Sequence, residues 1–307
     1  MFAHNDKTQL TDILPQVRGK YLKDVKLSKH TWFGVGGPAE VMFIPQDLDD
    51  LCHFLKAKPY NIPVCLIGGG SNLLIRDGGV SGVVIKLDSP YFKRLELHTH
   101  SITCYAGLKN IELKKVLLDN NLGGLEFLCS IPGCIGGSIK TNAGCFGRCI
   151  KDVLISATIV NSLGQIKEVM PEDLQLSYRN SFFPDDWIIV SITLKTEYTP
   201  KEEIAKILEE HKQYRIKNQP YNQRTAGSTF KNPQGLKAWE LIKKSGCADL
   251  QIGGAKVSEK HCNFLINTGT ATAKDIEDLG ETIIKKVKQK TSITLEWEVK
   301  RMGISDQ

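Results

Sequence analysis

The sequence predicts a mixed fold of helices and strands with more than one hydrophobic core. The chain has 307 residues, which is more than one small core accommodates. Hydrophobic residues make up 41% and charged residues 24%, the balance of an ordinary globular protein. Up to residue 198 the chain is rich in strand patterns and glycine loops, whereas from Thr199 to Lys290 the pattern is mostly helical.

The first predicted elements are one helix and several strands. Asp47 can cap a helix that ends before Pro59. The apolar run from Val64 to Ile67 predicts a short strand followed by three glycines, and the run from Gly82 to Leu87 predicts another strand. The segment from Leu95 to Ala106 alternates between apolar and polar residues, which is typical of strands with one face in water.

The next elements complete the strand-rich part. Asn110 predicts the cap of a second helix, which ends near Asn121. The segments from Ile155 to Val160 and from Gln165 to Val169 flank a glycine turn and predict a hairpin. The segment from Trp187 to Tyr198 predicts a long strand.

The C-terminal part begins with a helix signal. Thr199 to Glu202 fits a capping box with proline at the first helical position, so we place a domain boundary near Thr199. Thr272 opens the last predicted helix, whose apolar residues recur at spacings of three and four. The segment from Ile293 to Met302 predicts a closing strand.

Charge and hydropathy exclude several classes of function. The net charge is only +6, and the one dense basic run, from Lys285 to Lys290, suits a helix C-terminus better than a nucleic-acid patch. The uncharged stretch from Phe127 to Ile139 is too short for a membrane span, which needs about 20 apolar residues. Met1 to Leu10 shows no signal-peptide pattern, so we expect a cytoplasmic protein.

Metal binding is not expected either. Nine cysteines is an odd number, which argues against a secreted disulfide framework. The pairs Cys129 with Cys134 and Cys145 with Cys149 lack the spacing of zinc knuckles, and cysteine in such apolar surroundings is usually a small buried residue. His98 and His100 share a strand face without a third ligand nearby, so a solvated face is the better interpretation.

Glycine-rich segments carry the strongest signal. Gly34 to Ala39 matches a dinucleotide pattern, but Pro38 prevents the helix that a Rossmann loop requires. No glycine run precedes the Lys-Ser/Thr of a Walker loop. Gly68 to Asn72 and Ile131 to Ser138 remain, followed by Asn142 to Gly144. Either loop alone is best read as a tight turn, but together they could clamp a pyrophosphate through backbone N–H groups.

A longer series of motifs runs from about Thr31 to Gly303. Its members are Gly68 to Leu74, Arg76 to Gly79, Gly124 to Phe127, Ile131 to Gly137, Asn142 to Gly144, Ser177 to Ser181, Gly227 to Pro233, Gly253 to Ser258 and Leu295 to Val299. The series resembles the UDP-N-acetylenolpyruvoylglucosamine reductase family. Each motif is weak alone, whereas the ordered series is highly specific and covers nearly the whole chain.

The resemblance implies an α+β FAD-binding fold of the vanillyl-alcohol-oxidase (PCMH) type. Two subdomains, residues 1–90 and 91–198, would hold FAD between them. An α/β substrate domain would span residues 199–292, and residues 293–307 would form a closing strand that returns to the flavin side. Only Asn180 to Asp186 separate Arg179 from the next strand, so the chain resembles the shorter second type of the family, which lacks an extra loop there.

The implied reaction reduces the enolpyruvyl ether of a UDP-sugar to UDP-N-acetylmuramate, a peptidoglycan precursor. NADPH would donate the hydride and FAD would be bound non-covalently. Hydride addition leaves negative charge beside the substrate carboxylate, so the site needs a cation, a polarising partner and a proton donor. By their motifs, Arg179 would bind the carboxylate, Ser228 would donate the proton and Glu298 would stabilise the enolate. Glu296 shares the predicted strand face, and only the motif selects Glu298.

The resemblance also assigns the binding residues. Those for the cofactor are Gly68, Gly69, Gly70, Ser71, Asn72, Leu73, Pro132, Gly133, Gly136, Gly137, Ser138, Asn142, Ala143 and Gly144. Those for the substrate are Tyr178, Lys217, Lys231, Asn232 and His261. Asn218 replaces a family lysine before Gln219, and Lys217 stands one position earlier. NADPH would share the substrate cleft. The sequence does not fix the oligomeric state, and a monomer is our working expectation.

Two alternatives stay open at this point. The first is an oxidase of the same flavoprotein superfamily that tethers FAD covalently; the Gly68 loop offers no histidine or cysteine, so Cys134 and Cys145 are the nearby candidates. The second is a nucleotide-sugar sensor that has lost its flavin. The spectrum of the purified protein, and whether denaturation releases the chromophore, separates these alternatives.

Overall fold

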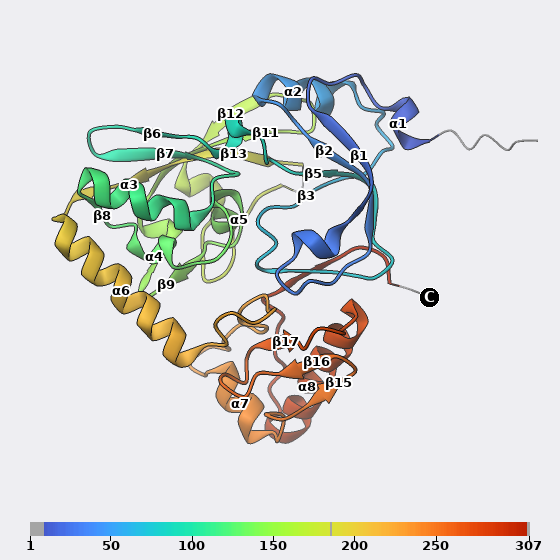
Figure 1. The fold of residues 1–307 in the computed structure, drawn as a ribbon, viewed down its shortest axis with the longest axis vertical. Coiled ribbons are helices and arrows are strands. Elements are labelled where there is room, and N and C mark those ends of the chain that lie inside the picture. Colours follow the sequence, from blue (N-terminus) through green and yellow to red (C-terminus); the bar gives the residue numbers. More distant parts are fainter. Residues whose placement is uncertain (1–8, 185, 306–307) are drawn as a thin grey trace, which may run out of the picture.

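The computed structural model describes residues 9–184 and 186–305, and it places strand-rich layers above a smaller C-terminal unit (Figure 1). Residues 1–8, which make up most of the segment searched for a signal peptide, lie outside the described residues. Within the described ranges, no helix has both the length and the apolar composition that crossing a membrane requires.

The first sheet has the strand order β1-β2-β5-β3. β1 is antiparallel to β2, whereas β5 runs parallel to both β2 and β3. Val41 and Phe43 join one core and Met42 another, because successive side chains of a strand point to opposite faces. The elements of this layer are α1 (Leu10–Ile13), β1 (Lys20–Lys26), β2 (Pro38–Ile44), α2 (Leu48–Ala57), β3 (Val64–Leu66) and β5 (Val80–Ile85).

The second sheet is antiparallel throughout, with the order β12-β11-β13-β7-β6. It contains the predicted hairpin as β11 and β12, and the predicted strands from Leu95 to Ala106 as β6 and β7. The predicted strand from Trp187 to Tyr198 is divided into two, β13 and β14. Two further pairs, β8 with β14 and β9 with β10, form small sheets of their own. The elements of this part of the chain are β6 (Leu95–Leu97), β7 (Ser101–Tyr105), α3 (Leu113–Asn120), β8 (Leu122–Gly123), α4 (Glu126–Cys129), α5 (Ile135–Lys140), β9 (Gly144–Cys145), β10 (Arg148–Cys149), β11 (Leu154–Val160), β12 (Ile166–Val169), β13 (Ile188–Lys195) and β14 (Glu197–Tyr198).

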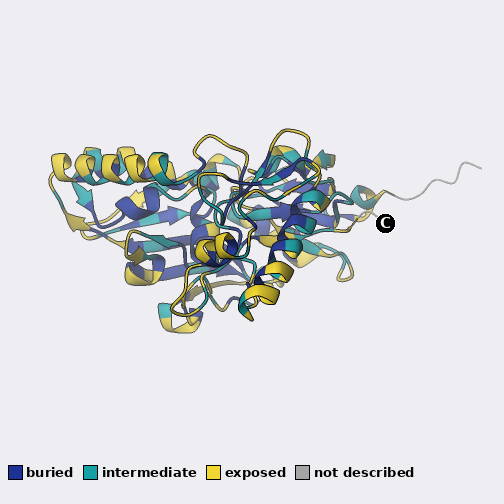
Figure 2. Cartoon of the chain, turned by 90° about the horizontal axis from the view of Figure 1, so that it is seen from below, coloured by how far each residue is buried: buried dark blue, intermediate teal, exposed yellow. Residues whose placement is uncertain are grey.

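The C-terminal unit is a small antiparallel sheet covered by helices, and α6 leads into it (Figure 1). Ile204 and Leu208 of α6 pack into the core of the strand-rich part, while the outer side of α6 is exposed (Figure 2, left). The elements are α6 (Lys201–Asn218), α7 (Ala238–Lys244), β15 (Gln251–Ile252), β16 (Ala255–Val257), β17 (Leu265–Asn267) and α8 (Ala273–Thr291). The predicted domain boundaries stay a prediction.

The chain ends by returning to the first layer. β18 (Lys300–Met302) pairs in parallel with β4 (Leu73–Ile75), directly after the first glycine loop. The predicted strand from Ile293 to Met302 was therefore too long. Glu298 lies before β18 in an extended segment, where the isolated bridge between Phe230 and Trp297 is the nearest pairing.

All four predicted helices form, but only two of their predicted N-caps are confirmed and the other two are wrong. The Asp47 side chain accepts a hydrogen bond from Asp50 N, and Thr272 forms a capping box with Asp275. Asn110 caps nothing, because its side chain is buried against the second glycine loop. At α6, Pro200 precedes the first helical residue and the predicted capping box is absent; Asn121 Oδ1 accepts from Lys201 N instead.

The cysteines and strand histidines show no metal-binding arrangement. All nine cysteines are free, and Cys129 and Cys134 are buried. His98 and His100 are exposed in the turn between β6 and β7. Within residues 9–184 and 186–305, no group of three or more histidine, cysteine, aspartate or glutamate side chains could hold a metal ion.

Candidate active site

The two glycine loops touch each other. A Cβ added at Gly69 would lie 2.8 Å from Gly133 Cα, and one added at Gly68 would lie 2.8 Å from Cys134 Sγ. The hydroxyl of Ser71 donates to the carbonyl of Pro132 at 2.9 Å. Glycine is therefore required at this contact, since any side chain would push the loops apart.

Backbone N–H groups at the same place are free to bind an anion. Within the described part of the chain, nothing accepts a hydrogen bond from the N–H groups of Gly69, Gly70, Ser71 or Gly137. Gly70 adopts φ +66°, a left-handed conformation that turns successive N–H groups toward one side. Free, converging N–H groups between two close-packed loops fit the pyrophosphate of a dinucleotide.

Asn110, which the sequence analysis took for a helix cap, shapes the second loop. Its Nδ2 donates to Ile131 O at 3.0 Å and to Ser138 Oγ at 2.8 Å, and its backbone N–H donates to Gly133 O. Ser138 is buried and its hydroxyl also donates to Cys134 O, so Ser138 supports the loop from inside.

The first loop is also tied to the closing segment. Asn72 Nδ2 donates to Glu298 O at 3.2 Å, and Asn72 O accepts from Lys300 N at 3.1 Å. Leu73 follows in β4 and packs against the core on the outer face of the first sheet. The side chain of Asn72 therefore positions the backbone that carries Glu298.

Asn142 links the second loop to the turn that carries Arg179. Its φ is +42°, its Oδ1 accepts from Lys151 N at 3.0 Å, and its Nδ2 donates to Ser177 O at 2.8 Å. Ala143 beside it is buried. The structure thus uses the side chain of Asn142 to hold the turn from Ser177 to Asn180.

Arg179 and Glu298 lie 119 positions apart in the sequence and form an ion pair. Arg179 Nε donates to Glu298 Oε1 at 2.8 Å, and Arg179 Nη2 donates to Gly144 O at 2.9 Å. Their side chains are 25% and 18% exposed, so the pair is largely shielded from water but reachable. Arg179 has φ +52°, a strained conformation for a residue other than glycine, as is common at functional sites.

The structure distinguishes Glu296 from Glu298, which the sequence periodicity alone could not do. The Glu296 side chain is 74% exposed and pairs with Lys231 at 3.4 Å. Burial raises the pKa of Glu298, whereas Arg179 and, more weakly, Lys231 oppose that shift. Glu298 therefore takes up a proton at a higher pH than an ordinary glutamate does, which makes its hydrogen-bond-donating form easier to reach.

Ser228 forms an isolated bridge with Phe264, and the next residue, Thr229, is hydrogen-bonded to the backbone of Glu298. Thr229 O accepts a hydrogen bond from Glu298 N at 2.8 Å, and Ser228 itself is half-buried. Asn263, which the sequence analysis missed, fixes this loop: its carbonyl accepts from Thr229 N, and its side chain makes both hydrogen bonds to the backbone of Phe230. The fold thus brings Glu298 and Arg179 into direct contact, and the backbone of Glu298 is hydrogen-bonded to Thr229, the residue after Ser228.

The predicted substrate residues are less closely grouped. Lys217 is exposed in the last turn of α6, and Tyr178 is 56% exposed with its ring 5.2 Å from the Arg179 guanidinium carbon. Asn232 Oδ1 is occupied by Ala238 N at the start of α7. His261 accepts from Asn263 N through Nδ1, and burial lowers the pKa of its ring, which favours a neutral imidazole whose other nitrogen can donate.

Comparisons with known proteins agree with this geometry. Residues 39–170 match the model of an FAD binding domain, and residues 219–302 match the C-terminal domain of UDP-N-acetylenolpyruvoylglucosamine reductase. These matches confirm the predicted fold class, an α+β FAD-binding domain followed by a reductase domain.

Relatives cover nearly the whole chain. The UDP-N-acetylenolpyruvoylglucosamine reductase of Paramagnetospirillum magneticum is 46% identical over 95% of both chains. That of Rhodospirillum rubrum is also 46% identical, over 99% of this chain and 97% of the relative. The crystal structure of the enzyme (MurB) from Thermus caldophilus superposes with a TM-score of 0.80 at 32% identity, covering 94% of this chain and 100% of that one.

Proposed function

The chain belongs to the UDP-N-acetylenolpyruvoylglucosamine reductase family, an FAD-binding oxidoreductase family of peptidoglycan precursor synthesis, and from this premise we propose its specific reaction. It reduces UDP-N-acetylglucosamine enolpyruvate to UDP-N-acetylmuramate with NADPH as the hydride donor. The observation that carries the proposal is the shielded pair of Arg179 and Glu298, tied to the second glycine-rich segment by Gly144 and to the neighbour of Ser228, Thr229, by a backbone hydrogen bond.

The proposed chemistry needs groups that act on the substrate carboxylate and on the carbon next to it. FAD, when bound, supplies the hydride for the vinyl carbon. Arg179 binds the carboxylate through its planar guanidinium, which matches two oxygen atoms. The added hydride leaves negative charge that spreads from the neighbouring carbon into the carboxylate, where Arg179 stabilises it.

Glu298 and Ser228 complete the reduction. A protonated Glu298 donates a hydrogen bond to the enolate; its raised pKa favours that form. Ser228 then gives its proton to the carbanionic carbon, so that one hydride and one proton together saturate the double bond. Serine is a weak acid, and its contribution depends on being held close to the carbon.

The cationic and amide groups of the C-terminal unit serve the diphosphate. We assign Lys217, Lys231, Asn232 and His261 to it, with Tyr178 against the substrate beside Arg179. Lys231 is held by Glu296 at 3.4 Å, an exposed contact that a diphosphate can replace at little cost. NADPH uses the same cleft before the substrate.

The glycine loops bind FAD non-covalently in this proposal. Free N–H groups of Gly69, Gly70, Ser71 and Gly137 hold the pyrophosphate, and a denatured sample should release all of its yellow colour. Retained colour would point instead to the covalent oxidase alternative. Cytoplasmic localisation and a monomeric state stay predictions.

A steady-state assay tests the proposed reaction. Purified protein should consume NADPH only when UDP-N-acetylglucosamine enolpyruvate is present, and mass spectrometry should find a product heavier by H2. A protein without flavin absorbance that cannot be reconstituted with FAD would favour the sensor alternative. NADPH consumption that needs oxygen but not the sugar nucleotide would contradict the proposal.

A further inference from the structure

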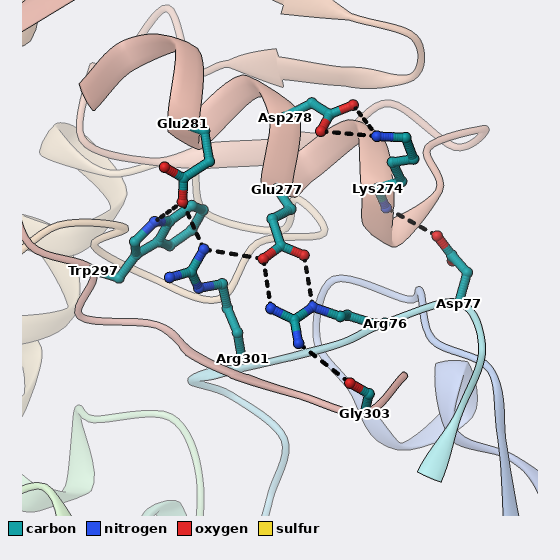
Figure 3. Close-up of polar contacts among 9 residues, drawn as sticks. All are labelled: Arg76, Asp77, Lys274, Glu277, Asp278, Glu281, Trp297, Arg301 and Gly303. Atoms are coloured by element: carbon teal, nitrogen blue, oxygen red, sulfur yellow. Dashed lines mark hydrogen bonds and ion pairs between the residues drawn. The ribbon is translucent and has the colours of Figure 1, made fainter. Parts of the chain in front are cut away.

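A network of charged side chains joins three segments that are distant in the sequence (Figure 3). We call Arg76, Glu277, Glu281, Trp297 and Arg301 the α8 network. Arg76, just after β4, donates to both carboxylate oxygens of Glu277, from Nε at 2.9 Å and from Nη2 at 2.8 Å. Arg301, in β18, donates to Glu277 at 3.0 Å and to Glu281 at 2.6 Å.

The beginning of α8 is anchored to the same loop. The Asp77 carboxylate accepts hydrogen bonds from Ala273 N and Lys274 N, each at 2.9 Å. A carboxylate at this end of a helix satisfies free N–H groups and matches the helix dipole. Arg76 and Asp77 therefore fix the first turns of α8 relative to β4, the strand that follows the first glycine loop.

Trp297 binds α8 directly and is the residue next to Glu298, so the position of α8 affects the position of Glu298. The indole N–H donates to Glu281 at 2.9 Å, and the Arg301 guanidinium lies 4.6 Å from the centre of the indole ring. The ring packs onto Gly280, where a Cβ would lie 2.2 Å from ring atoms. Trp297 can occupy this place only because Gly280 has no side chain.

The charges of the network are balanced, so they fit a structural junction rather than a ligand site. Two arginines face two glutamates, and the hydrogen bond from Arg76 is the main cause that lowers the pKa of Glu277. Partly exposed ion pairs contribute little to stability, but a two-pronged arginine–carboxylate contact fixes geometry. Trp297 and Arg301 stand on either side of Glu298 in the sequence and both bind glutamates of α8, so the network fixes the backbone around Glu298.

We propose that the α8 network positions Glu298 for the reduction of the substrate, which makes Glu277, Glu281 and Trp297 positioning residues. The inference rests on the proposed function and extends it. Glu298 is held by Asn72 and Thr229 through its backbone, by Trp297 on one side and by β18 on the other. Loss of the network shifts its carboxyl group relative to Arg179 and leaves the glycine loops in place.

Two variants and a matched control test the inference. Trp297→Phe keeps an aromatic ring but removes the hydrogen bond to Glu281. Glu277→Gln removes the charge that both arginines share. Asp278→Asn is the control, because this neighbouring carboxylate of α8 pairs with Lys274 on the same helix. The measurements are the rate of flavin reduction by NADPH, the rate of flavin reoxidation by the enolpyruvyl sugar nucleotide, and the Tm.

In Trp297→Phe and Glu277→Gln, reoxidation by the sugar nucleotide should slow by up to about 10²-fold, as misplacement of a catalytic group by an ångström can cause. Reduction by NADPH should keep the wild-type rate, and Asp278→Asn should match wild type in both steps. Wild-type reoxidation in both variants, or an equal loss in both steps, would overturn the inference. Failure of wild type and control to be reoxidised by the sugar nucleotide would overturn the proposed function itself.

Discussion

Arg179 connects the second glycine loop, the turn at Ser177 and the closing segment. Its guanidinium donates to Gly144 O and to Glu298, so a substrate carboxylate must compete with Glu298 for it. The raised pKa of Glu298 eases this exchange, since a carboxyl that becomes neutral loses its attraction to the guanidinium. The substrate carboxylate can thereby take the place of Glu298 beside Arg179, and the protonated Glu298 is then able to donate a hydrogen bond.

Arg179→Lys tests the two-pronged contact. Lysine keeps the positive charge but cannot bind two carboxylate oxygens in a plane, so turnover should fall steeply while NADPH still bleaches the flavin. Rapid-mixing absorbance measurements on each step provide the comparison. Normal reduction of the sugar nucleotide by Arg179→Lys would remove Arg179 from the mechanism.

Ser228→Ala tests the proton donor. The variant should fold, bind FAD and be reduced by NADPH at the wild-type rate, but its reoxidation by the sugar nucleotide should collapse by ~10²–10⁴-fold, the usual contribution of a general acid. Ser228→Cys should keep part of the activity, because a thiol can donate from nearly the same place. A loss well below tenfold in the alanine variant would move the role to Glu298 or to a water molecule.

The pH dependence of reoxidation tests Glu298. Its pKa is raised, so the carboxyl is protonated below that pKa and loses its proton as the pH rises through it. The rate of reoxidation should therefore fall across this rise in wild type. Glu298→Gln, always neutral, should be slower but lack this descending limb. A limb of equal position and depth in both proteins would assign it to another group.

At the scale of elements, the glycine loops allow a test that separates folding from cofactor binding. A Cβ at Gly137 would lie 3.9 Å from Cys134 Sγ, an ordinary van der Waals contact, and alanine suits a helix better than glycine. Gly137→Ala should therefore keep the Tm of the apoprotein but bind FAD more weakly in a fluorescence titration. Gly69→Ala should lower the Tm and also weaken FAD binding, because its Cβ would clash with Gly133. Unchanged FAD affinity in Gly137→Ala would place the pyrophosphate elsewhere.

The N-caps of the helices show which features can be predicted from neighbouring residues alone. Asp47 and Thr272 cap their helices as predicted, because the hydrogen bond needs only the next three residues. Asn110 fits the same rule but is drawn away by Ile131 and Ser138. The start of α6 is capped by Asn121, 80 positions away, a partner that no local pattern contains.

At the scale of the whole molecule, strands and site residues also divide into those that local sequence predicts and those that depend on distant contacts. β1 is mostly polar and exposed, so no strand pattern marks its sequence. β2 is more buried and was not predicted either. The resemblance identified Arg179 and Glu298, which the fold brings into contact, and Ser228, whose neighbour Thr229 is hydrogen-bonded to the backbone of Glu298. Asn263, Asn110 and the α8 network were not predicted, because each acts through contacts between distant segments.

The most direct test of the account is a two-step experiment without oxygen. NADPH added to the wild-type protein should bleach the flavin absorbance, and UDP-N-acetylglucosamine enolpyruvate added next should restore it while UDP-N-acetylmuramate forms in stoichiometric amount. A flavin that NADPH does not bleach, or that stays bleached with the sugar nucleotide and recovers only when oxygen is admitted, would contradict the account.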